Sequence, residues 1–363
     1  MVYRILSLDG GGIRGVLSAQ ILASLETLID RPLHEYFDMI AGTSTGSIVA
    51  ASLVLEKSAK QIVELYRKNG STIFPYWGKT SYLSPKRFKL LLNYGLSAPK
   101  FSNQGLCDVL KQEFSETKTV TDITLSSGRK PKLLIFSYDT VSRSPIVFKS
   151  WRTSNWYADV TLWEACACSA SAPTFFPAYQ VSGGGKSCAA IDGGVAANNP
   201  VTGAIAEAIN LGEKIEDIRV LSIGTGEYAS GFPYKDVKQW GVLQWAGHII
   251  DVLMDAPVDI SDYVARQLIN TQDRETDHYI RLQPLLSNTY LRDLFDAELE
   301  RQLPIGISRR NLKLTTAMDN ASRENIEALI ALGKAYVKNG KCSEKLTVRQ
   351  KIQDFIDEAR GGD

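Results

Sequence analysis

The chain has 363 residues, 44% of them hydrophobic, and a formal net charge of +1. This is the composition of a globular protein of one large or two small domains. The near-neutral charge gives no reason to expect a nucleic-acid partner. Because no run of 18 or more residues is apolar throughout, we expect no membrane span.

The cysteines and the N-terminus favour a cytosolic protein. A strand is predicted almost at Met1, which leaves no room for a signal peptide before it. The five cysteines are an odd number, and Cys166 and Cys168 form a C-x-C pair with no histidine nearby. We therefore expect five reduced thiols and no metal site.

The first sixty residues contain the succession strand, turn, helix twice. The apolar run Tyr3–Leu8 predicts a buried strand, and the helical period of Val16–Ile29 predicts a helix. Phe37–Ala41 and Ser47–Leu55 repeat that succession. This order predicts a parallel sheet with helices on its faces.

The later elements complete one domain. We expect helices at Ala59–Asn69, Pro85–Leu92, Asn103–Phe114, Leu162–Ala172, Ile326–Val337 and Val348–Ala359, and strands at Leu133–Tyr138, Ser144–Lys149, Cys188–Asp192, Val220–Ile223 and Tyr279–Leu282. Long helical pieces lie between Gln239 and Ile269, with an interruption expected at Pro257. We assign residues 1–340 to this domain and residues 341–363 to a C-terminal amphipathic helix.

A run of three glycines, Gly10, Gly11 and Gly12, joins the first strand to the first helix. Fixing three glycines is costly in entropy, and the usual reason is close approach of backbone N–H groups to a ligand. At a helix N-terminus such groups hold an anion, either a bound phosphate or a charge that exists only during a reaction. The run also satisfies the dinucleotide pattern G-x-G-x-x-G, but no strand ends in an acidic residue about twenty positions on, because Asp38 lies at the beginning of its strand rather than at its end.

The segment Gly42-Thr43-Ser44-Thr45-Gly46 has the form of a nucleophile elbow. Such a serine lies on a sharp turn between a strand and a helix, and the flanking glycines relieve crowding. An apolar stretch precedes Ser44 and a small-residue helix is expected after it, as this chemistry requires. The alternative is that Ser44 is an ordinary helix N-cap.

Asp192 is the best candidate for the base that would activate this serine. It ends a predicted strand directly before Gly193 and Gly194, so its carboxylate is expected at the same sheet edge as the other two loops. The alternative is that Asp192 forms a structural turn. None of the three histidines, His34, His248 and His278, lies in a recognisable catalytic segment, and we expect them to be packed or solvated.

Taken together, Asp9-Gly-Gly-Gly-Ile-Arg-Gly15, Gly42-Thr-Ser-Thr-Gly46, Asp192-Gly-Gly194 and Ala170-Ser-Ala-Pro-Thr-Phe-Phe-Pro177 resemble the patatin family of lipid acyl hydrolases. The resemblance spans residues 3 to about 226. It implies a three-layer α/β/α fold with a mostly parallel central sheet and, in this chain, extra C-terminal helices. Ser47 is a departure, because plant relatives tend to carry glycine there.

The same resemblance implies a function and a set of residue roles. It implies hydrolysis of acyl esters in phospholipids or galactolipids, with Ser44 as nucleophile and Asp192 as base. Gly10, Gly11, Gly12 and Arg14 would lie at the oxyanion hole, with Arg14 either contacting the charge or only holding the loop. No cofactor or metal is implied, calcium included, and the missing leader favours a bacterial-type cytosolic form.

Two further forms of the same fold stay open from the sequence. One is a storage-type protein with weak or no catalysis, which the intact Ser44 and Asp192 oppose. The other is an effector switched on by a cyclic nucleotide, as some bacterial patatin-like proteins are. The C-terminal half has room for such a site, although no residue there points to one.

A peripheral membrane contact is also expected from one basic and aromatic stretch. No acidic residue occurs between Glu64 and Asp108, and aromatic residues are interleaved with the cations Arg67, Lys68, Lys79, Lys86, Arg87, Lys89 and Lys100. Such a composition suits the surface of an anionic membrane. The alternative is that the lysines are merely solvated while the apolar residues pack in the core.

Overall fold

The structure is a computed structural model that describes residues 2–361 except 77–86, 88–89, 93–94, 96–97, 130, 230, 271–276 and 345. In the described residues an eight-stranded sheet has the order β5-β6-β3-β2-β1-β7-β9, with β4 paired on β3. Its strands are β1 (Tyr3–Leu8), β2 (Met39–Thr43), β3 (Lys132–Asp139), β4 (Ser144–Lys149), β5 (Tyr179–Gly183), β6 (Lys186–Asp192), β7 (Ile218–Ile223) and β9 (Tyr279–Leu282). Strands β1, β2, β3, β7 and β9 are parallel, whereas β4, β5 and β6 pair antiparallel.

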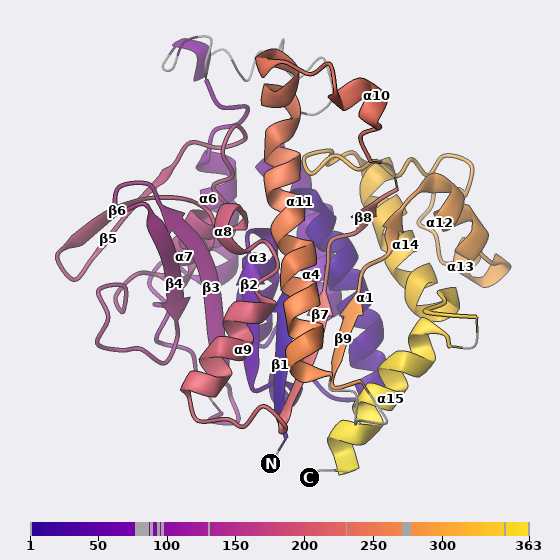
Figure 1. The fold of residues 1–363 in the computed structure, drawn as a ribbon, viewed down its shortest axis with the longest axis horizontal. Helices are drawn as coiled ribbons and strands as arrows, with labels where there is room; N and C mark the ends of the chain where they lie inside the picture. The colour runs from indigo at the N-terminus through magenta and orange to yellow at the C-terminus, as the bar shows by residue number, and fades with distance from the viewer. Residues whose placement is uncertain are drawn as a thin grey trace.

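Helices cover both faces of this sheet (Figure 1). On one face, a large core is built with α1 (Gly15–Ile29), α3 (Thr45–Val54), α4 (Ala59–Ile73), α6 (Gln104–Phe114), α7 (Leu162–Ala170), α14 (Arg323–Asn339) and α15 (Val348–Gly361). On the other face lie α8 (Gly194–Ala197), α9 (Val201–Asn210) and α11 (Val242–Ile269). Alternation along β1 explains the two cores, because Leu6 and Leu8 enter the first while Tyr3 and Ile5 enter the second.

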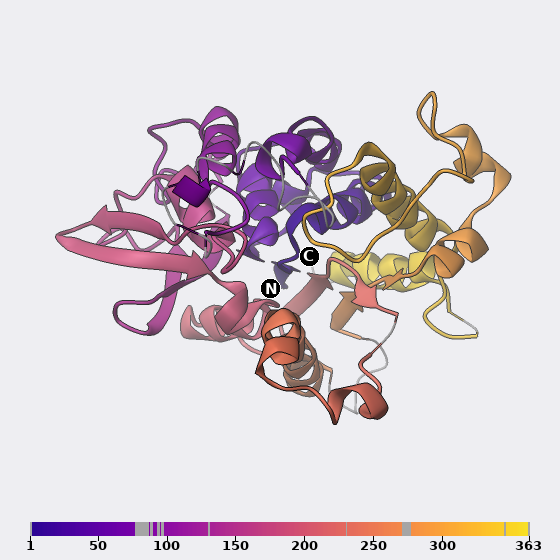
Figure 2. The ribbon, with the colours of Figure 1, turned by 90° about the horizontal axis from the view of Figure 1, so that it is seen from above.

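Short elements connect these layers. They are η1 (Gly12–Arg14), α2 (Leu33–Tyr36), β8 (Glu227–Tyr228), α10 (Tyr234–Val237), β10 (Leu285–Leu286), α12 (Asn288–Leu294) and α13 (Ala297–Arg301). Seen from above in Figure 2, α10 and α11 lie on one side of the molecule, and α12 to α15 lie beside the sheet. The three-layer fold with a mostly parallel sheet is therefore confirmed.

Helix α11 differs from its prediction, since it continues through Pro257 instead of ending there. Proline removes one backbone donor from a helix, but packing can outweigh that loss. The inward side of α11 is buried at Met254, Val258, Ala265 and Ile269 on both sides of the proline. Burial of that side explains why the helix is not interrupted.

The most apolar long helix is a core element. In the described part of the chain, the segment Gly12–Ile29 is the one stretch long and apolar enough to cross a membrane, with a mean hydropathy of 1.2. Of its residues, 72% are buried in this structure, where α1 packs against α4 and α14. Its hydropathy is thus explained by burial inside the protein.

The last helix also packs on the larger core. Helix α15 contacts α14 and buries Val348, Ile352, Phe355 and Ile356. The division of the chain at residue 340 stays a prediction.

The helix expected at Pro85–Leu92 is only partly described. Arg87 and residues 90–92 are described, and its other residues lie outside the described part.

Candidate active site

Ser44 lies on a sharp turn between β2 and α3. Its backbone has φ 53° and ψ −124°, a left-handed conformation that is costly for a residue with a side chain. The two flanking glycines are required by close approaches. A Cβ on Gly42 would lie 2.3 Å from the Gly46 carbonyl oxygen, and one on Gly46 would lie 2.2 Å from that of Leu8. The glycine spacing in the sequence therefore reflects the geometry of this turn.

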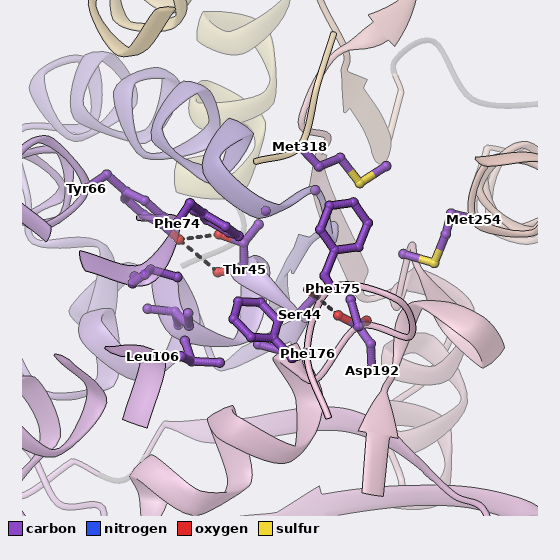
Figure 3. A pocket seen from close by; sticks show the side chains of 16 residues that line it. Ser44, Thr45, Tyr66, Phe74, Leu106, Phe175, Phe176, Asp192, Met254 and Met318 are labelled. Carbon is purple, nitrogen blue, oxygen red and sulfur yellow. Dashed lines mark hydrogen bonds between the residues drawn. The ribbon is translucent and has the colours of Figure 1, made fainter. Parts of the chain in front are cut away.

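The Ser44 hydroxyl donates a hydrogen bond to Asp192, at 2.6 Å between Oγ and Oδ2 (Figure 3). Asp192 ends β6, and its other carboxyl oxygen accepts the Gly194 N–H at 2.7 Å. Burial raises the pKa of the Asp192 carboxyl to about 7, against the lowering effect of these two hydrogen bonds. The sheet thus brings together two predicted site residues 148 positions apart, with a carboxyl that titrates near neutral pH.

Ser169, at the end of α7, supports this turn and was not identified from the sequence. Its hydroxyl accepts the Ser44 N–H at 2.8 Å and donates to the Phe136 carbonyl at 2.6 Å, while its own carbonyl accepts the Gly193 N–H. It therefore links the turn of Ser44 to the turn that follows Asp192. Its position directly before the Ala170–Pro177 segment was the one available clue.

A second serine hydroxyl also binds the backbone of the elbow. Ser47, the departure from plant relatives, donates its hydroxyl to the Ser44 carbonyl at 2.6 Å. This bond lies within the first turn of α3, where Ser44 is the N-cap residue. The serine at position 47 thus fixes the turn without lining the pocket described below.

Two N–H groups of the glycine run, those of Gly11 and Gly12, are candidate donors to an oxyanion. The Gly10 N–H is engaged, because it donates to the Asn198 carbonyl at 3.1 Å. In the described residues, the N–H groups of Gly11 and Gly12 have no acceptor, and both glycines line the same pocket as Ser44. A Cβ on Gly11 would lie 2.2 Å from Thr225 Oγ1, and one on Gly12, whose φ is 60°, would lie 2.1 Å from the Met318 carbonyl oxygen. Both positions therefore require glycine.

Arg14 holds this loop from outside the pocket. Its Nε donates to the Gly11 carbonyl at 3.4 Å, Nη1 reaches the Thr316 carbonyl at 3.5 Å, and the guanidinium lies 5.2 Å from the Tyr228 ring centroid. It is buried and does not line the pocket that contains Ser44. Of the two roles left open for Arg14, the geometry favours the structural one.

Asp9, the first residue of the glycine motif, is fixed by a buried ion pair. Both of its carboxyl oxygens accept from Arg281 on β9, at 2.9 and 2.5 Å, and Arg281 also donates to Ser222 at 2.7 Å. Both partners are at least nine-tenths buried. Because two donors face two acceptors, the pair holds the start of the loop in a single orientation. Arg281 was not singled out from the sequence.

A pocket of about 50 Å³ opens beside Ser44 and Asp192. Its other lining residues are mostly apolar: Gly11, Gly12, Thr45, Ile48, Tyr66, Ile73, Phe74, Leu106, Ala170, Ala172, Phe175, Phe176, Met254 and Met318. Figure 3 shows Phe175 and Phe176 next to Ser44, with Met254 and Met318 further out. Such a lining suits a hydrocarbon chain whose polar end lies at the serine.

The histidines do not contribute to this pocket. None of His34, His248 and His278 lines it. In the described part of the chain there is no group of three or more His, Cys, Asp or Glu side chains that could hold a metal ion. All five cysteines are unpaired, as expected from the sequence.

Comparisons with known proteins give a consistent picture. A family model described as patatin-like phospholipase matches residues 6–205. Patatin-like protein 2 from Arabidopsis thaliana is 32% identical over 317 residues, covering 77% of this chain and 75% of that protein. Probable inactive patatin-3-Kuras 1 from Solanum tuberosum is 27% identical over 351 residues, covering 87% of this chain and 88% of that protein.

A comparison of structures finds human GIVD cytosolic phospholipase A2 at 12% identity and a TM-score of 0.47. The match covers 99% of this chain and 60% of the human chain. The sequence matches are closer, since they join the glycine run, the elbow and the Asp192 turn in one family model. The chain belongs to the patatin-like phospholipase family, a family of lipid acyl hydrolases.

Proposed function

We propose that the protein cleaves fatty acyl esters of membrane glycerolipids, phospholipids or galactolipids, with Ser44 as nucleophile and Asp192 as base. The observation that carries the proposal is the 2.6 Å hydrogen bond from a strained, glycine-flanked serine to a buried carboxyl at the end of an apolar pocket. A structural N-cap serine needs neither that partner nor that pocket. Strain held at such a position is typical of functional sites.

The proposed chemistry has two halves. The Ser44 Oγ attacks the ester carbonyl carbon while Asp192 takes its proton, and the developing oxyanion accepts hydrogen bonds from the Gly11 and Gly12 N–H groups. Asp192 then gives the proton to the departing alcohol oxygen, which leaves an acyl group on Ser44. Water attacks this acyl-enzyme as Asp192 takes its proton, and returning that proton to Ser44 Oγ releases the fatty acid.

The raised pKa of Asp192 suits both directions of proton transfer. An ordinary carboxylate is a weak base for a serine hydroxyl. Burial raises the pKa of Asp192 to about 7, so its basicity is increased while a substantial carboxylate fraction persists at neutral pH. The hydrogen bond to Ser44 already has the geometry that this transfer needs.

The test is hydrolysis of a soluble chromogenic medium-chain ester by the purified protein. We expect Ser44→Ala to abolish turnover and labelling by a fluorophosphonate, which reacts with activated serines. Ser52→Ala is the matched control, because Ser52 is a buried serine of α3 whose hydroxyl has no hydrogen-bond partner among the described residues. Turnover that survives Ser44→Ala, or that is lost equally in Ser52→Ala, would refute the role of Ser44.

We further propose that catalysis needs no calcium or other metal. The steps above use only two side chains and backbone donors, so EDTA should leave the rate on the soluble ester unchanged. Inhibition by EDTA that added calcium reverses would refute this part of the proposal. It would leave the role of Ser44 to be judged by the substitution above.

Two alternatives from the sequence are judged in different ways, one from the structure and one from these assays. The glycine run is less suited to a nucleotide site than its sequence pattern suggests. The Gly10 and Ile13 N–H groups already donate to protein carbonyls, so they are not available to a phosphate. A storage-type protein remains the second candidate, because one relative carries the name of a probable inactive patatin. Absence of both turnover and fluorophosphonate labelling in the wild-type chain would favour that candidate.

We also propose a cytosolic location with peripheral membrane contact, although the described part of the basic stretch gives it little support. Arg67 pairs with Glu327 and Glu64, Lys100 pairs with Asp319, and Arg87 is buried with a bond to a backbone carbonyl. Of the other cations in the stretch, Lys68 is exposed, whereas Lys79, Lys86 and Lys89 lie outside the described residues. A lipid contact is better sought elsewhere on the molecule.

A further inference from the structure

A partly exposed aromatic cluster lies where α10 meets α11. The ring centroids of Phe232 and Trp240 are 5.0 Å apart, and those of Trp240 and Trp245 are 5.2 Å apart. Beside them Tyr234 is 81% exposed and Val242 is 86% exposed. We call these five residues the aromatic tip. Figure 1 shows α10 and the adjoining end of α11 beyond the carboxyl ends of the parallel strands.

The aromatic tip is not an extension of the protein core. None of its five residues belongs to either of the two cores that the described residues form. The Trp240 ring contacts those of Phe232 and Trp245, and His248 contacts Phe232 and stacks on Trp240 with centroids 4.6 Å apart. Gathered apolar side chains, of which Phe232, Tyr234 and Val242 stay exposed, indicate an interaction surface.

Two features relate the aromatic tip to the site of Ser44. Helix α11 carries Val242 in the tip and, about 18 Å further along its axis, Met254 in the lining of the Ser44 pocket. A second cleft, of about 560 Å³, is lined by Phe232 and His248 as well as by Gly10 and Arg14. A partner held on the tip would therefore border the second cleft and lie about 18 Å along α11 from the Ser44 pocket.

We propose that the aromatic tip docks on a lipid bilayer at the boundary between head groups and acyl chains, and delivers a lipid to the Ser44 pocket. The inference rests on the proposed function for the choice of a lipid as partner. Tryptophan and tyrosine prefer this boundary, where an apolar ring and a polar group are both accommodated. Val242 and Phe232 add apolar area that water otherwise covers.

Charge distinguishes this surface from the basic stretch. Residues 231–249 contain Lys235, Lys238 and Asp236 as their charged side chains, a net charge of +1. Acidic residues also line the second cleft, among them Glu227 and Asp259. Docking by the aromatic tip is therefore expected to depend on apolar burial and to occur on zwitterionic vesicles, with little sensitivity to salt.

The experiment measures binding in the Ser44→Ala background, so that catalysis does not alter the vesicles. The docking variant combines Tyr234→Asp and Val242→Asp. The matched control combines Ile209→Asp and Leu268→Asp, which are 45% and 44% exposed near the C-terminal ends of α9 and α11. Each protein is co-sedimented with phosphatidylcholine vesicles and with vesicles of equal parts phosphatidylcholine and phosphatidylglycerol.

We expect the docking variant to bind both kinds of vesicle at least about tenfold more weakly than the control pair. With Ser44 restored, it should lose activity on vesicle lipid by a similar factor and keep the wild-type rate on a soluble ester. Tryptophan emission should shift to shorter wavelength when the wild-type chain binds vesicles. That shift should be weaker in the docking variant at the same vesicle concentration.

Three outcomes would overturn the proposal. One is equal vesicle binding by the docking and control variants. Another is binding that occurs only on anionic vesicles and is abolished by salt, which would indicate that the lysines make the contact. The third is a wild-type dimer that the docking variant converts to a monomer with unchanged vesicle binding, because a second copy would then cover the tip. Failure of the proposed function appears separately, as absent hydrolysis of the soluble ester by the wild-type chain.

Discussion

Because the Asp192 carboxyl is buried, we expect one substitution there to lower the activity and to raise the stability of the protein. Asp192→Asn keeps the size of the side chain and an oxygen that can accept the Gly194 N–H. It removes the ionisable group that the proposed mechanism needs. We expect activity on a soluble ester to fall by several orders of magnitude, as for the loss of a base in other serine hydrolases. We also expect the folded protein to become more stable at alkaline pH.

The size of that gain follows from the pKa of Asp192, which burial raises from 3.8 to about 7. Because the folded state binds this proton more tightly than the unfolded state, the stabilising effect is fully present below pH 3.8 and is lost as pH rises through about 7. The difference of about 3 units corresponds to roughly 4 kcal/mol at 1.36 kcal/mol per unit. Asparagine does not titrate, so the variant avoids this loss.

The assay is urea unfolding of wild type and variant at a series of pH values from about 4 to about 9. The free energy of unfolding of Asp192→Asn minus that of wild type should increase as pH rises through this window, by up to about 4 kcal/mol. Ser44→Ala is the control, because it removes a hydrogen bond that lowers the pKa of Asp192 and keeps the carboxyl. The free energy of unfolding of Ser44→Ala should depend on pH at least as steeply as that of wild type. A constant difference between Asp192→Asn and wild type across the window would refute the reasoning.

Three further predictions concern the same site. On a soluble ester, kcat/KM should rise with pH to a plateau and be half-maximal near pH 7, where Asp192 ionises; a rate independent of pH between about 5 and 9 would exclude it as the base. Ser169→Ala removes the acceptor of the elbow N–H, and we expect a loss of about 1–3 kcal/mol in unfolding free energy together with a lower kcat; an unchanged kcat would contradict its positioning role. Arg281→Met should cost about 3–5 kcal/mol by leaving the Asp9 carboxylate unpaired, and Asp9→Asn in the same chain should recover part of it; no recovery would show that the charge is not the cause.

The sequence alone determined those features that local geometry imposes on residue type. The strand at Tyr3–Leu8 is confirmed with its predicted bounds, and α1 and α6 each begin one residue from theirs. The turn at Ser44 could be recognised from the glycines at 42 and 46, because a Cβ at either position would meet a backbone carbonyl oxygen. Such requirements act within a few residues, so they leave a spacing that can be recognised without knowing the fold.

Only the tertiary structure decided which distant groups complete the site. Ser169 lies 125 positions from Ser44, and Arg281 lies 272 positions from Asp9. Neither pairing leaves a local pattern, because the sheet order brings these residues together and no turn or helix period does. The same is true of the Gly10 N–H, whose acceptor is the Asn198 carbonyl, and of the pKa of Asp192, which burial raises. Residue type at a turn is fixed by neighbours along the chain, whereas partners and burial are fixed by packing.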